Sequence, residues 1–257
     1  AAGARATLLT DAAVVSRYLE QLLVAARALL TSRPLAETLH VLLRLGNHLN
    51  VGTANGNAQG YRVLATLAKA SDLKAHNTAE RATLIDFLVE VLENHLPHLL
   101  HTPAELKPVA EVERIDYDWV RSEVERLQSS VDAVRAELTY AKLRAESGAV
   151  PHLHVGVNAD GRARVHVYTD RFEAEMGPFL EEAAAAAEKA RAAHSQFVAT
   201  FPELVVYFGE SPDSCTPPEL FGGLCRYLRD FEAAVSRMRA RKEKTGTSEL
   251  PVVAPAL

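Results

Sequence analysis

The sequence predicts an all-α protein, built as an elongated helical rod that contains an antiparallel coiled-coil section. Hydrophobic residues make up 48% of the 257 residues but aromatic residues only 6%, and alanine is abundant, which favours helices over strands. Apolar residues recur at helical spacing along most of the chain. Two segments also keep a four-three alternation of apolar residues over several turns, which is typical of supercoiled helices.

The first hundred residues predict four helices. Apolar spacing indicates a helix over about residues 10–30, and Pro34 then breaks the chain before a second helix over about 35–48. A turn-rich stretch at 47–60 holds three glycines and four asparagines, and a short helix follows near 61–70. Asn77 and Thr78 offer caps for a helix that continues through Leu92 and stops at Pro97.

Two later runs predict the coiled coil. The first run begins near Ile115, and the second run follows the middle of the chain. Small alanines in the second run would let the two helix axes approach closely. The seam residues are Val120, Val124, Leu127, Val131, Val134, Leu138 and Ala141 in the first run, and Met176, Leu180, Ala183, Ala187, Ala190, His194, Phe197 and Phe201 in the second run.

Between these runs, the alternation of polar and apolar residues predicts an inserted β-hairpin at about residues 152–167. A three-residue loop at 158–160 would pair Val157 with Gly161, and the odd-numbered apolar residues of both strands would then share one face. The same register would pair Val155 with Ala163 and Leu153 with Val165.

Histidines do not predict a metal site. His152, His154 and His166 would share the polar face of the hairpin, where three imidazoles can bind zinc, but Arg162 and Arg164 on that face oppose a cation. A second set, at 95, 98 and 101, is interrupted by Pro97, so its members are not expected to converge.

The last predicted helix covers about residues 217–244, and residues 245–257 are expected to form a disordered tail. The C-terminal end of this predicted helix is basic. Two explanations are open, namely a favourable interaction with the helix dipole and attraction to an acidic partner surface. The predicted packing residues are Leu220, Phe221, Leu224, Leu228, Phe231 and Val235, and the basic residues are Arg237, Arg239, Arg241, Lys242 and Lys244.

Composition and motifs exclude several classes of function. The net charge of −5, with both signs mixed, gives no reason to expect nucleic acid as a partner. Cys215 and Cys225 match no metal or redox spacing, and a reducing intracellular setting is the simpler interpretation. We find no catalytic motif, no secretory signal and no apolar run that could span a membrane, so neither an enzyme nor a cofactor is predicted. Because the sequence does not begin with Met, we expect a piece of a longer polypeptide.

A series of short motifs resembles the formin homology-2 domain. The stretch Leu-Gly-Asn-His-Leu-Asn at 45–50 is similar to the family's Leu-Gly-Asn-Tyr-Met-Asn signature. Five further elements follow in the family's order: an Ala-x-Gly-Tyr segment at 57–63, a Thr-Leu-Ile-x-Phe-Leu helix at 83–88, an acidic-to-Pro element at 93–97, Tyr-Phe-Gly-Glu at 207–210 and Pro-x-Glu-x-Phe at 217–221.

The resemblance implies a modular rod of lasso, linker, knob, coiled coil and post, in which two protomers close a ring because each lasso encircles the partner's post. Residues 1–244 would then be a partial domain that holds the end of the knob, the coiled coil and a helical post subdomain. The lasso, the linker and most of the knob are expected upstream of residue 1.

The same resemblance implies the function. We expect a cytoplasmic, actin-binding module of the actin cytoskeleton that nucleates filaments and stays processively at the barbed end as part of a homodimer. An upstream proline-rich region would recruit profilin-actin. The alternative is a helical coiled-coil scaffold without actin assembly activity.

Two groups of residues are the candidate sites. Gly46, Asn47, Asn50 and Gly60 would form the pocket for the partner's lasso, because glycine lets another backbone approach and an amide both donates and accepts. An ordinary helix C-terminus would also contain Gly and Asn. Candidates for actin contact are Arg62, Lys69 and Lys74, although simple solvated cations are an equally direct explanation for Lys74.

Overall fold

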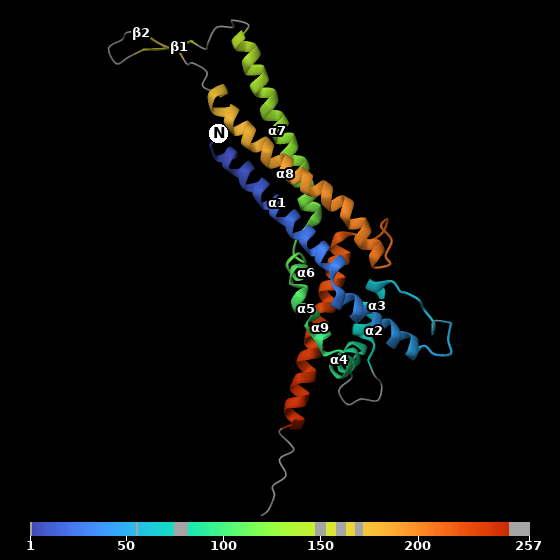
Figure 1. The fold of residues 1–257 in the computed structure, drawn as a ribbon. Coiled ribbons are helices and arrows are strands. Elements are labelled where there is room, and N and C mark those ends of the chain that lie inside the picture. The colour runs from blue at the N-terminus through green and yellow to red at the C-terminus, as the bar shows by residue number, and fades with distance from the viewer. Residues whose placement is uncertain are drawn as a thin grey trace, which may run out of the picture. The chain divides into compact units, whose positions relative to one another are not determined.

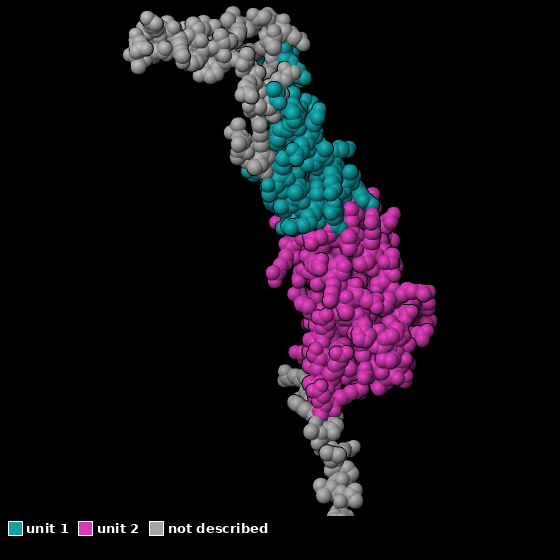
Figure 2. Space-filling view, turned by 60° about the vertical axis from the view of Figure 1, so that its left-hand side comes forward, with its two compact units in different colours: residues 1–20, 118–196 teal, residues 21–117, 197–257 magenta. Residues whose placement is uncertain are grey.

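The computed structural model describes residues 2–54, 56–74, 82–146, 153–157, 163–167 and 172–246 and has an all-α fold with one short hairpin (Figure 1). Two compact units divide the chain, residues 1–20 with 118–196 and residues 21–117 with 197–257 (Figure 2). The elements are α1 (Ala2–Thr31), α2 (Arg33–Leu49), α3 (Val63–Asp72), α4 (Leu84–His95), the 3₁₀ helix η1 (Pro97–His101), α5 (Thr102–Glu105), α6 (Lys107–Glu111), α7 (Tyr117–Glu146), β1 (Leu153–Val157), β2 (Ala163–Val167), α8 (Phe172–Tyr207) and α9 (Pro217–Gly246).

The first unit contains the two long helices predicted to form the coiled coil. The two helices run antiparallel (Figure 1), and His194, late in α8, lies within electrostatic reach of Arg121 and Glu125, early in α7. The predicted seam is buried at most positions, and Val134 is half-buried. The buried seam residues of this unit are Val120, Val124, Leu127, Val131 and Leu138 of α7, and Met176, Ala183, Ala187 and Ala190 of α8.

The start of α1 packs with these two helices. The sequence predicted the helix but not its place in this bundle. The start of α1 buries Leu8, Ala12, Val15 and Leu19. Asp11 pairs with Arg126 of α7, and Glu20 pairs with Lys189 of α8 at 2.9 Å. Seam spacing alone did not reveal this because two-helix and three-helix bundles share the same apolar alternation.

The hairpin forms where it was predicted, but its register differs from the prediction. β1 and β2 pair antiparallel with Val157 opposite Ala163 and Val155 opposite Val165, so residues 158–162 separate the strands. The predicted pairing of Val155 with Ala163 was therefore wrong by two residues. A shift of two keeps odd residues opposite odd residues, so the apolar pattern could not distinguish the two registers. The histidine face and the side chains of both strands lie outside the described part of the structure.

Helix α9 forms the centre of the second unit and contacts α3, α4, α5 and α6. All six packing positions predicted for this helix are buried. Opposite them lie the buried faces of α3, formed by Val63, Leu67 and Ala70, and of α4, formed by Ile85, Leu88, Val89 and Leu92.

Helix α4 begins at Leu84, later than predicted. Its N-cap is Thr83, whose hydroxyl accepts from the backbone N–H of Asp86 at 3.2 Å, while the Asp86 carboxylate accepts from the Thr83 N–H at 2.8 Å. This reciprocal capping box replaces the predicted caps at 77 and 78, which lie outside the described residues. The predicted stop is confirmed, because α4 ends at His95 and Pro97 starts the 3₁₀ helix.

The basic end of α9 has an intramolecular role that neither sequence-based explanation included. Arg237 Nη2 lies 2.7 Å from Asp86 Oδ1, and Lys242 Nζ lies 2.6 Å from Glu93 Oε1. These cations therefore tie α9 to α4.

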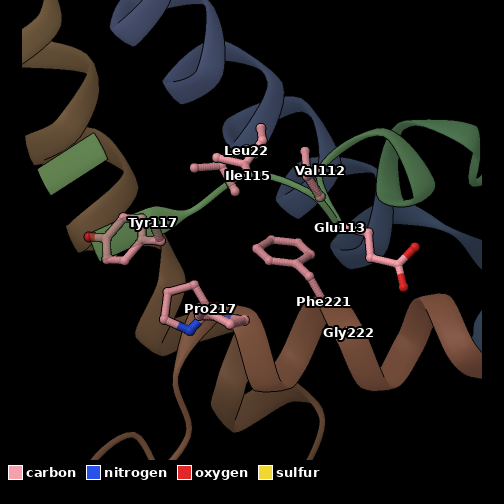
Figure 3. A pocket seen from close by; sticks show the side chains of 9 residues that line it. Leu22, Val112, Glu113, Ile115, Tyr117, Pro217, Phe221 and Gly222 are labelled. Carbon is pink, nitrogen blue, oxygen red and sulfur yellow. The ribbon is translucent and has the colours of Figure 1, made fainter. Parts of the chain in front are cut away.

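The start of α9 packs closely on the segment before α7 (Figure 3). A niche of about 10 Å³ lies there between Leu22, Ile115, Tyr117 and Phe221. This volume is that of about one water molecule, so the niche is too small for a ligand. None of the described helices carries an apolar stretch long enough to cross a bilayer.

Candidate functional site

Residues 61–64 lie against residues 208–210, and we call these two segments together the Arg62 corner. The N–H of Val63 donates to the carbonyl of Phe208 at 3.1 Å. Gly209 has φ +68°, a left-handed conformation that ends α8, and a Cβ there would lie 3.0 Å from the Tyr61 carbonyl oxygen. Glycine at this position therefore permits both the turn and the close approach.

Glu210 joins the two halves of the Arg62 corner. Its side chain is 3% exposed, and its Oε2 accepts from Arg62 Nε at 3.1 Å and from Arg62 Nη2 at 2.9 Å. Its Oε1 accepts from the backbone N–H of Leu64 at 3.0 Å. The first N–H groups of a helix lack intrahelical partners, and the Arg62 side chain makes no cap bond, so Glu210 caps α3 from a distant element.

Arg62 combines a fixed position with a high exposure. Its side chain is 67% exposed although two of its nitrogens are bound by Glu210. Among the described residues no acceptor contacts Nη1. This edge of the guanidinium can therefore meet a carboxylate from outside the chain.

A cavity of about 310 Å³ adjoins the Arg62 corner. Its walls combine the apolar side chains of Leu64 and Ala65 with Cys215 and two carboxylates, those of Glu210 and Glu219. Glu219 caps the start of α9 by accepting from the Thr216 N–H at 2.8 Å, and this hydrogen bonding lowers the pKa of Glu219. Burial, together with the charges of Glu210 and Glu219, outweighs the effect of Arg62 and raises the pKa of the Cys215 thiol, which makes this thiol a weaker nucleophile than a free cysteine.

The other two predicted cations lie further along the chain, one on α3 and one beyond its end. Lys69 is in the last turn of α3, about two turns from Arg62, and Lys74 follows the helix with its backbone bridged to Thr83. Both are exposed, and within the described ranges neither has an ion-pair partner.

The predicted lasso pocket lies at residues 46–60, which we call the Gly46 corner. Asn47 Nδ2 donates to the Ala58 carbonyl at 2.9 Å, and Asn47 Oδ1 accepts from the Ala58 N–H at 3.0 Å. Asn50 Nδ2 donates to the Gly46 carbonyl at 2.8 Å. We expected these amides to bind an incoming chain. They instead form hydrogen bonds within this chain, because the backbone groups of the turn need hydrogen-bond partners.

The Gly46 corner nevertheless lies at the surface. A Cβ added at Gly46 or at Gly60 would meet nothing within 4 Å. Two apolar residues beside them, Leu49 and Val51, are 62% and 71% exposed. The end of the loop is anchored on α2, because the Tyr61 hydroxyl donates to the Leu39 carbonyl at 2.8 Å.

Sequence reasoning missed Glu210 as a functional candidate. The Tyr-Phe-Gly-Glu motif is visible in the sequence, but the motif alone indicates no role for its acid. The contact joins residues 148 positions apart, and no spacing along the chain reveals such a pair.

Comparison with known proteins places both corners within one family. The Formin Homology 2 Domain matches residues 3–232. Human Disheveled-associated activator of morphogenesis 2 is 28% identical over 228 residues, which cover 88% of this chain and 19% of that protein. Formin-like protein 13 of Arabidopsis thaliana is 26% identical over 237 residues, which cover 88% and 17% of the two chains.

A similar match is found in an amoeba. Formin-H of Dictyostelium discoideum is 24% identical over 213 residues, which cover 83% of this chain and 18% of that protein. The chain thus spans less than a fifth of the length of these curated relatives. Since the family match covers most of the 257 residues, the chain belongs to the formin homology 2 domain family.

Proposed function

We propose that this chain is an actin-binding module that takes part in filament nucleation and in processive association with the growing barbed end, within a homodimer. The family match over residues 3–232 is the observation that carries this proposal. It includes the motifs that form the Gly46 corner and the Arg62 corner.

The proposed mechanism needs no covalent chemistry, so we propose no enzymatic activity. Holding two or three actin subunits in a filament-like arrangement removes part of the entropic cost of forming a nucleus. Stiff helices suit this task, because a rigid surface loses little freedom when the subunits bind.

Arg62 is the proposed centre of the actin contact, with Lys69 and Lys74 as supporting cations. Arg62 has an exposed charge whose position is fixed by Glu210, and the two lysines are exposed further along the chain. Such cations attract an acidic partner surface, and this attraction weakens as salt increases.

The Gly46 corner is the proposed seat for the lasso of a second protomer. Open space above Gly46 and Gly60 lets a backbone approach, and Leu49 and Val51 offer apolar surface beside it. In this proposal Asn47 and Asn50 shape the seat through their own-chain hydrogen bonds rather than binding the lasso directly. Recruitment of profilin-actin by a proline-rich region, and a place in the cytoplasmic actin cytoskeleton, belong to the same proposal.

Actin co-sedimentation and the assembly of pyrene-labelled actin test this function. We expect the chain to bind actin at low salt, and the combined variant Arg62→Ala, Lys69→Ala and Lys74→Ala to bind more weakly. A matched control removes three exposed cations elsewhere, Lys107→Ala, Arg114→Ala and Arg226→Ala, and should bind like the wild type. Absence of actin binding and of any effect on assembly would contradict the proposal and favour the scaffold alternative.

A further inference from the structure

We propose that Glu210 is a positioning residue for the actin contact, because its buried carboxylate sets where the Arg62 guanidinium stands at the rim of the neighbouring cavity. This inference rests on the proposed function of Arg62. It adds a second residue, from a distant segment, and states the chemistry of the surface that the Arg62 corner would recognise.

The exposures of the two partners differ widely. The Glu210 side chain is 3% exposed, whereas the Arg62 side chain is 67% exposed. A carboxylate is costly to bury unless its oxygens are hydrogen-bonded. Both oxygens of Glu210 are satisfied, one by Arg62 and the other by the Leu64 N–H. The acid is therefore part of the framework, and the arginine is the part that meets solvent.

One carboxylate fixes both the helix and the side chain. Oε1 holds the first turn of α3 through Leu64, and Oε2 holds Nε and Nη2 of Arg62. The long arginine side chain thus loses part of its rotamer freedom before any partner arrives, so less entropy is lost on binding. Lysine could not make the same contact, because it has a single nitrogen in place of the planar fork.

The surroundings define the chemistry of the partner surface. The Nη1 edge suits a carboxylate, and the cavity of about 310 Å³ beside it is lined by Leu64 and Ala65 together with two carboxylates that already have partners. Glu210 is bound by Arg62, and Glu219 is bound by Thr216. We therefore infer that the Arg62 corner takes an acidic side chain of actin next to an apolar one. Cys215, also in the wall of this cavity, offers a natural chemical reporter of occupancy.

A double-mutant cycle separates positioning from a purely structural role. The variants are Arg62→Ala, Glu210→Gln and the combination of both, and Glu203→Gln on the exposed surface of α8 is the matched control. The measurement is the affinity for actin filaments by co-sedimentation, with the midpoint of thermal unfolding recorded for each variant. We expect Glu210→Gln to weaken binding about threefold to tenfold in the wild-type background and to have no effect when Arg62 is already alanine.

Each other outcome has a defined meaning. If Glu210→Gln weakens binding equally with and without Arg62, Glu210 acts through the fold and the positioning proposal is wrong. The proposal is also wrong if Arg62→Ala weakens binding while Glu210→Gln does not. If Arg62→Ala itself leaves the affinity unchanged, the proposed actin contact of Arg62 fails, whatever Glu210 does.

Two measurements keep the proposal testable should Glu210→Gln fail to fold. Arg62→Lys keeps the charge but loses the two-nitrogen contact, so it should bind nearly as weakly as Arg62→Ala, and wild-type affinity would contradict the proposal. In the unmutated chain, actin should slow alkylation of Cys215 severalfold, as followed by peptide mass spectrometry. An unchanged rate in the actin-bound chain would exclude the cavity from the contact.

Discussion

At the scale of single residues, Tyr61 shows how one hydroxyl fixes the end of a long loop. Its side chain crosses to α2, where it donates to the Leu39 carbonyl, and burial raises the pKa of Tyr61 above its ordinary value. The phenol therefore stays protonated throughout the physiological pH range and keeps its donor. Because Arg62 is the next residue in the chain, this hydrogen bond also helps to hold the backbone of Arg62 in place.

Replacing Tyr61 by phenylalanine tests this anchorage. We expect Tyr61→Phe to lower the free energy of unfolding by about 1 kcal/mol, because the hydrogen bond between the Tyr61 hydroxyl and the Leu39 carbonyl is lost. Urea denaturation measures the change, and Tyr207→Phe, at a side chain that is 47% exposed, is the control. Equal stability of the two variants would contradict the role assigned to the hydroxyl.

The two cysteines are predicted to differ in reactivity. Cys225 is 2% exposed, and burial raises its pKa to about 11, while Cys215 is partly exposed. Because the thiolate is the reactive form, iodoacetamide at pH 8 should modify Cys215 first and reach Cys225 only on unfolding. Peptide mass spectrometry, with a urea-unfolded sample as the reference, reports both sites. Rapid labelling of Cys225 in the native chain would show that α9 is less tightly packed than described.

At the scale of elements, Asp86 links two helices. It closes the capping box of α4 and accepts from Arg237 of α9, and its side chain is 7% exposed. Burial alone would raise the pKa of Asp86, but the hydrogen bonds from Thr83 and the pairing with Arg237 outweigh burial and lower it below 3.8. A single acid thus stabilises the start of one helix and the attachment of another.

Asp86→Asn is predicted to lower the free energy of unfolding at pH 7 by about 1 to 2 kcal/mol. The folded pKa lies below the unfolded value, so the stabilisation is fully present above the unfolded pKa and is lost as pH falls through the folded pKa. The difference between wild type and variant should therefore shrink below pH 3.8. Chemical denaturation at several pH values gives the comparison, with exposed Asp213→Asn as control. A difference that stays constant down to the lowest pH would rule out the charge of Asp86 as its cause.

The sequence predicted those elements whose signals are local. Apolar spacing located α9 and its six packing residues, and the four-three alternation located α7 and α8. The start of α4 was predicted too early, because several polar residues can cap a helix and only the Thr83–Asp86 pair closes a capping box. The hairpin register was missed because a shift of two leaves the apolar pattern unchanged.

The site was only partly predictable for a related reason. Arg62 and the glycines stood out through their motifs, but the partners of Asn47 and Arg62 lie elsewhere in the chain. Hydrogen-bond partners of this kind depend on how the helices pack. They cannot be predicted from composition or from the spacing of apolar residues. The same limit hid the packing of the start of α1 with α7 and α8, although the helix itself was predicted.

At the scale of the whole molecule, the Arg62 corner is assembled from distant parts of the sequence. Residues 61–64 come from the first quarter of the chain, residues 208–210 from its last quarter, and α9 packs against α3 beside them. The formin fold therefore brings together a cation and an acid that have no local relation. We propose that this surface meets actin.

Photo-crosslinking from Ala65 tests that claim most directly. Ala65 is exposed and lines the cavity beside Arg62, so Ala65→p-benzoylphenylalanine places a reactive group there without removing any described contact. The same group at Ala233, exposed on α9, is the control. We expect a crosslink to actin from residue 65 and none from residue 233. A chain that still binds actin but crosslinks only from residue 233 would contradict it.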